Sequence, residues 1–116
     1  MRNVFIFLFI LVTTAAYPKH KLLERDYVAQ YCTGGTEFTL PDRTRVDCLT
    51  DEYAIEFDFA PKWAEALGQS LHYARMTGRE PGIYLILESG KDMRFVDILS
   101  PLCDLYGVKL ELIQNY

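Results

Sequence analysis

The chain has 116 residues, of which 50% are hydrophobic and 14% aromatic, so it suits one folded domain and excludes a disordered chain. Its 12 basic and 16 acidic residues give a formal net charge of −4, which excludes nucleic-acid binding through bulk positive charge. Any binding of phosphate must therefore depend on a local group of basic residues or on a metal ion. The three cysteines, Cys32, Cys48 and Cys103, fit neither a disulfide-dense miniprotein nor the ligand spacing of a structural zinc site.

The first 16 residues have the layout of a secretory signal peptide. A positive start at Arg2 precedes the apolar run Val4–Val12, and small residues follow before Tyr17. This run is too short for a membrane-spanning helix, which needs about 20 residues. A buried strand or helix, or a wrongly chosen start codon, is the alternative. We expect an exported (periplasmic or secreted) domain over residues 17–116, with 100 residues, a charge of −5 and no stable membrane insertion; without a signal the protein would be cytoplasmic.

Helical periodicity, alternating apolar residues and turn residues predict eight elements after residue 17. In chain order these are a helix over Lys19–Cys32, strands over Thr36–Leu40, Thr44–Thr50 and Tyr53–Phe59, a helix over Pro61–Thr77, a strand over Gly82–Glu88, a helix over Lys91–Tyr106 and a strand over Val108–Ile113. Pro101 is a candidate kink or break in the last helix. The order α-β-β-β-α-β-α-β predicts an α/β fold with a mixed sheet flanked by helices.

The hairpin of the second and third predicted strands brings acidic residues together. With Asp51–Glu52 as its loop, Asp47 faces Glu56 and, two residues along, Arg45 faces Asp58. The period of two places these four side chains on one face of the sheet. The opposite face is expected to be core and carries Val46, Cys48, Ile55, Phe57 and Phe59.

Directly opposed carboxylates destabilise a sheet unless something compensates for their repulsion. A divalent cation would do so, because Mg²⁺ is commonly held by one or two carboxylates together with water and substrate phosphates. Two alternatives remain open. The like charges could be tolerated on a solvated edge, or the register could slip, because Asp-Glu is not a favoured two-residue turn.

The helix after this hairpin carries a polar stripe. Lys62, Glu65, Gln69 and Tyr73 recur at steps of three and four residues and therefore share one side of the helix. Such a stripe is either a solvated face or part of a site.

Three stretches resemble motifs of the PD-(D/E)xK nuclease superfamily, which has the restriction-endonuclease-like fold. They are Arg45–Asp47, Ala54–Asp58 and Gln69–Tyr73, and the last is similar to the Q-x-x-x-Y element of the exonuclease branch. The resemblance covers roughly residues 19–90. It implies a metal-dependent nuclease that hydrolyses phosphodiester bonds of nucleic acid, with DNA the expected substrate.

The resemblance also implies roles for individual residues. Asp47 and Glu56 would coordinate Mg²⁺ or Mn²⁺, with the Phe57 carbonyl as a candidate third ligand, and the metal would activate water. Glu24, an acid of the first helix as in some members, would reach the metal through water. Gln69 and Tyr73, the two residues of the Q-x-x-x-Y element, would help to position the phosphate or the residues of the third strand.

The chain departs from the motif at position 58, where the family has a lysine and this sequence has Asp58. Lys62, one turn into the next helix, could supply the missing positive charge. Alternatively, Asp58 pairs with Arg45 across the strands. The protein would then be a catalytically inactive nuclease-fold module with an exported binding or structural role.

The cysteines add one expectation. Cys32 ends the first predicted helix and Cys48 points to the core face, so these two could form a disulfide if the chain is exported, which would leave Cys103 free. The sequence does not indicate an oligomeric state.

Overall fold

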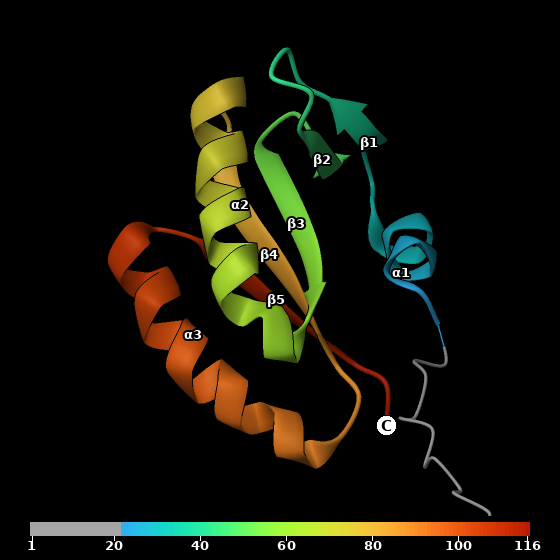
Figure 1. The fold of residues 1–116 in the computed structure, drawn as a ribbon, viewed down its shortest axis with the longest axis vertical. Helices are drawn as coiled ribbons and strands as arrows, with labels where there is room; N and C mark the ends of the chain where they lie inside the picture. The colour runs from blue at the N-terminus through green and yellow to red at the C-terminus, as the bar shows by residue number, and fades with distance from the viewer. Residues whose placement is uncertain (1–21) are drawn as a thin grey trace, which may run out of the picture.

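Five strands form one mixed sheet in the order β1-β2-β3-β4-β5 in the computed structural model, which describes residues 22–116 (Figure 1). The first three strands pair antiparallel, whereas β4 joins β3 and β5 joins β4 in parallel. The expected α/β mixed sheet flanked by helices is confirmed. The elements are α1 (Glu24–Tyr31), β1 (Gly35–Thr39), β2 (Arg45–Leu49), β3 (Tyr53–Phe59), η1 (Ala60–Lys62), α2 (Trp63–Thr77), β4 (Glu80–Leu87), η2 (Gly90–Asp92), α3 (Met93–Tyr106) and β5 (Lys109–Gln114).

Helix boundaries differ from the expectation at two places. The first helix begins at Glu24, because the N–H of Leu23 donates to the Asp26 carboxylate at 2.8 Å and fixes the first turn. The last helix continues through Pro101, which is exposed, so the expected kink or break does not divide it. The predicted signal peptide lies outside the described residues. Between residues 22 and 116, no helix is long and apolar enough to cross a bilayer.

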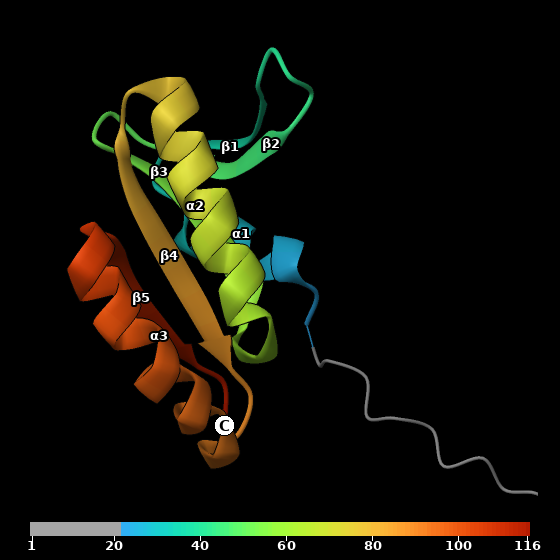
Figure 2. The ribbon, with the colours of Figure 1, turned by 60° about the vertical axis from the view of Figure 1, so that its left-hand side comes forward.

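The two faces of the sheet are covered by different helices (Figure 2). On one face, α2 and α3 pack over Ile83, Leu85 and Leu87 of β4. On the other face, α1 covers Phe57 and Ile55 of β3. The placement of α1 follows from its two buried residues, Tyr27 and Val28, which belong to this second core cluster.

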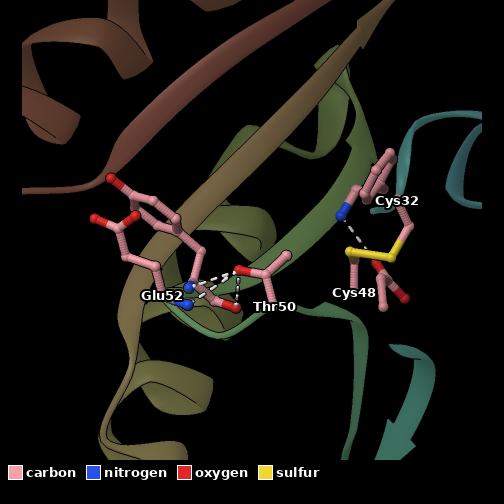
Figure 3. Close-up of a disulfide and its surroundings, with 7 residues drawn as sticks. Cys32, Cys48, Thr50 and Glu52 are labelled. Atoms are coloured by element: carbon pink, nitrogen blue, oxygen red, sulfur yellow. Dashed lines mark hydrogen bonds between the residues drawn. A yellow bond between two sulfur atoms is a disulfide. The ribbon is translucent and has the colours of Figure 1, made fainter. Parts of the chain in front are cut away.

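The hairpin register agrees with the prediction where the strands pair. Cys48 lies opposite Ile55 and Leu49 lies opposite Ala54. The turn is fixed by Thr50, whose hydroxyl accepts hydrogen bonds from the N–H of Tyr53 at 2.9 Å and the N–H of Glu52 at 3.3 Å (Figure 3). This hydroxyl stabilises a turn whose two central residues do not favour it, and so prevents the register slip.

The part of β2 that precedes Cys48 is not paired with β3, and there the β1–β2 hairpin turns away from β3 (Figure 1). One expectation fails at this bend. Val46 does not share the Cys48 side but packs with Ala54 and Tyr73 beneath α2. The bend coincides with Glu37 on β1, whose φ of 51° is a left-handed conformation that interrupts regular alternation.

A disulfide joins Cys32 to Cys48, with a Cα–Cα distance of 5.7 Å and a sequence separation of 16 (Figure 3). The expected pairing is confirmed, and Cys103 is free and buried. Because Cys32 follows the last residue of α1, the bridge fastens the C-terminal end of this short helix to β2.

Removing the bridge with Cys32→Ser and Cys48→Ser together is expected to lower the free energy of unfolding by about 3 kcal/mol. The loss is that of a cross-link closing a loop of this length. Urea unfolding of the oxidised protein and of the double variant measures it. Cys103→Ala is the control, since it removes the free thiol and keeps the bridge; equal stability of the wild-type protein and the double variant would contradict the prediction.

Candidate metal centre

Three carboxylates from three different elements meet at the place where β2 leaves β3. Glu24 comes from α1, Asp47 from β2 and Glu56 from β3, and each offers an oxygen within 4.8 Å of the other two. Glu56 is only 5% exposed. The structure therefore gathers the three acids that were predicted as metal ligands.

Local structure explains the position of each acid. The Asp47 carboxylate accepts the N–H of Phe57 at 2.8 Å, so a side chain takes the place of a strand-to-strand hydrogen bond where the ladder ends. Glu56 follows Ile55, the last β3 residue paired with β2. Glu24 lies in the first turn of α1, which Val28 and the disulfide hold against the sheet.

The negative charges of the three carboxylates are only partly compensated by the nearby Lys62 and Arg45. Burial and the neighbouring Asp47 raise the pKa of Glu56 to about 10. Burial and the charges of Asp58 and Asp47 raise the pKa of Glu24 to about 7. Burial also raises the pKa of Asp47, even though the Phe57 N–H favours its charged form. At neutral pH the three acids cannot all ionise without a cation beside them.

One oxygen of this group has no partner. Within residues 22–116, the buried Oε2 of Glu56 accepts no hydrogen bond. Such an atom normally costs about 1–3 kcal/mol, so native structures rarely leave one. Carboxylate oxygens are the ligands that Mg²⁺ and Mn²⁺ prefer. The residues present therefore fit a divalent cation of this type.

Asp58 and Lys62 lie beside the three carboxylates. Asp58 is 3% exposed and shares a hydrogen bond with Glu24. Burial raises the pKa of Asp58 to about 6, although the charge of Lys62 lowers it. The alternative pairing of Asp58 with Arg45 is wrong. Within the described residues 22–116, the guanidinium of Arg45 lies 3.9 Å from the carboxylate of Glu37 instead. The charge of Lys62 thus acts on Asp58 and Glu24, and the charge of Arg45 lowers the pKa of Asp47.

A cavity of about 680 Å³ opens beside this group between α1, the β1–β2 hairpin and η1. Its charged lining consists of Glu24, Arg25, Glu37, Arg45, Asp47 and Lys62.

No family model, curated protein or solved structure matches this chain. The architecture and the geometry of the carboxylates are therefore the basis for a functional proposal, together with the motif resemblance.

The structure places the two residues of the predicted Q-x-x-x-Y element, Gln69 and Tyr73 of α2, in different surroundings. Tyr73 is 5% exposed, and burial followed by the charges of Glu56 and Asp47 raises its pKa to about 12. Tyr73 therefore lies close enough to Glu56 and Asp47 for their charges to act on its hydroxyl. Gln69 is exposed on α2 and does not line the cavity.

Sequence reasoning did not single out Glu37 or Leu23, which line the cavity, and considered Arg45 only as a partner for Asp58. Glu37 lies near Asp47 because β1 pairs with β2, and the sequence pattern did not indicate this pairing. Leu23 comes from a helix start that the pattern had placed earlier in the chain. Neither residue belongs to a motif that could have indicated it.

Proposed function

We propose that the protein is a metal-dependent phosphodiesterase that hydrolyses nucleic-acid phosphodiester bonds, with a restriction-endonuclease-like fold. The observation that carries this proposal is the unpartnered Oε2 of Glu56 within a group of three carboxylates. A Mg²⁺ or Mn²⁺ ion held by Glu24, Asp47 and Glu56 would give that oxygen its partner. The resemblance of the Asp47 and Glu56 motifs to the PD-(D/E)xK superfamily supports the same chemistry.

The residues have distinct tasks in such a reaction. A bound divalent ion supplies an acidified water and neutralises charge on phosphate. Asp47 and Glu56 would hold the ion from the sheet, and Glu24 would hold it from α1. Lys62 offers positive charge to a phosphate oxygen from the cavity wall. In the hydrolysis the water oxygen bonds to phosphorus, the ester P–O bond breaks, and the water proton ends on the leaving oxygen.

A second candidate function is supported by Asp58, the acid at the position where the superfamily has a lysine. A nuclease-fold protein without that lysine could act as an inactive, exported module that binds nucleic acid or serves a structural role. The Cys32–Cys48 disulfide is consistent with an oxidising compartment, and we propose an exported location on that ground.

Calorimetric titration with Mn²⁺ and Mg²⁺ tests the metal site. The wild-type protein is expected to bind, and Asp47→Asn should weaken binding at least about tenfold, as losses around metal ligands usually do. Asp51→Asn is the matched control, since Asp51 is an exposed acid in the hairpin turn.

Absence of binding by the wild-type protein, or equal binding by both variants, would overturn the metal site. A hydrolysis assay on single-stranded DNA and on plasmid DNA with Glu56→Gln then separates the two functions. Hydrolysis of either DNA that depends on Glu56 supports the phosphodiesterase, whereas metal binding without hydrolysis of either DNA supports the inactive module.

A further inference from the structure

The cavity beside the carboxylates has an apolar side as well as a charged one. Leu23, Val28, Phe59 and Pro61 provide it. Val28 and Phe59 are core residues that are 3% and 7% exposed, but Leu23 is 50% exposed and Pro61 is exposed too. Leu23 and Pro61 therefore present apolar surface to whatever occupies the cavity.

This apolar surface is held next to the charged groups of the site. Leu23 directly precedes Glu24, and its N–H is fixed by the Asp26 carboxylate at 2.8 Å. Pro61 directly precedes Lys62 within η1, and its ring restricts the backbone there. Each apolar side chain is thus one residue away from a group assigned to the metal or to phosphate.

The charged lining would favour an anionic occupant once a divalent cation is bound. Arg25, Arg45 and Lys62 are matched by an equal number of acids, Glu24, Glu37 and Asp47, so the two positive charges of the ion would leave the lining with a positive balance. Proteins hold single-stranded nucleic acid by positive charge along its phosphates and by side chains, most often aromatic ones, that cover the faces of its bases. In this cavity Leu23 and Pro61 would provide aliphatic surface for a base.

The size of the cavity helps to decide between a single strand and a duplex as its occupant. About 680 Å³ lies within the range of pockets that enclose small ligands. In a duplex the bases are stacked inside, so an apolar wall meets only sugars and phosphates unless a base is extruded. An unpaired base has a free face that such a wall can cover.

We propose that the cavity accepts an unpaired nucleotide, with its base against Leu23 and Pro61 and its phosphate beside Lys62, so that the substrate is single-stranded nucleic acid. The hydrolytic step of this inference rests on the proposed function, but the preference for an unpaired strand can be measured by binding alone.

The test uses a labelled DNA oligonucleotide, alone and annealed to its complement, with Mn²⁺ present. Fluorescence anisotropy should show tighter binding of the single strand than of the duplex, and Leu23→Ser should lower the affinity for the single strand about fivefold, as expected from covering the exposed half of a leucine side chain. Leu22→Ser is the matched control, because Leu22 is 40% exposed and adjacent but does not line the cavity. Neither variant should change Mn²⁺ affinity. An RNA strand of the same sequence shows whether the sugar matters.

Two results would overturn the inference: equal binding of single strand and duplex, or equal effects of Leu23→Ser and Leu22→Ser. Hydrolysis of the same oligonucleotides is scored separately. Single-strand binding that depends on Leu23, without hydrolysis, would refute the proposed phosphodiesterase and leave this inference standing. Hydrolysis of both forms at equal rates, without a binding preference, would do the reverse.

Discussion

Replacing Lys62 with alanine is expected to lower the rate of metal-dependent phosphodiester hydrolysis by about a hundredfold to a thousandfold, the usual cost of removing one group that stabilises transition-state charge. Lys62 lines the cavity, and its charge lowers the pKa of the neighbouring Asp58 and Glu24. No lysine stands at position 58 to take its place. The loss should therefore fall on kcat.

Metal binding distinguishes this catalytic role from a structural one. Lys62→Ala removes a positive charge near the carboxylates, so Mn²⁺ affinity measured by calorimetry should stay equal or rise slightly. Lys91→Ala is the control, because Lys91 is an exposed lysine of η2 outside the cavity lining and its loss should leave the rate unchanged. If both alanine variants kept full activity, Lys62 would be an ordinary surface residue.

The hairpin that carries the site could be predicted because its signals are local. Apolar and polar residues alternate along β2 and β3, and the pairing of Cys48 with Ile55 follows from the position of the turn. That register was enough to bring Asp47 toward Glu56. It failed at Val46, because the bend that moves Val46 beneath α2 depends on packing against Tyr73, a contact distant in sequence.

The contribution of α1 could not be predicted to the same degree. Its weak amphipathic pattern suggested a start at Lys19, and nothing in the sequence fixed how the helix would lie across the sheet. The resemblance suggested Glu24, but its placement within 4.8 Å of Asp47 and Glu56 requires the docking of Val28 and the disulfide at Cys32. Such positions depend on contacts between distant parts of the chain, which periodicity does not report.

Glu56→Gln is expected to make the metal-free protein more stable at about pH 8, by about 1–3 kcal/mol, while abolishing stabilisation by Mn²⁺. At pH 8 the wild-type carboxyl must take up a proton on folding, because burial and Asp47 raise its pKa to about 10, whereas the amide is neutral in both states and can still donate to Asp47. A gain in stability on loss of this acid would indicate that Glu56 serves binding rather than stability.

The sign of the pH dependence follows from the pKa of Glu56, which is raised from 4.5 in the unfolded chain to about 10 in the folded one. Between these values the folded state binds the proton more tightly, so the contribution of Glu56 to the stability of the metal-free protein is fully present below about pH 4.5 and is lost as the pH rises toward 10. Urea unfolding at about pH 5 and pH 8 should show this fall in the wild-type protein and a smaller one in Glu56→Gln. Glu52→Gln, at an exposed acid of the hairpin turn, should behave as wild type. Mn²⁺ at pH 8 should reverse the order of stability, because only the wild-type protein retains Glu56 as a ligand; an unchanged order would show that this buried acid does not serve a metal.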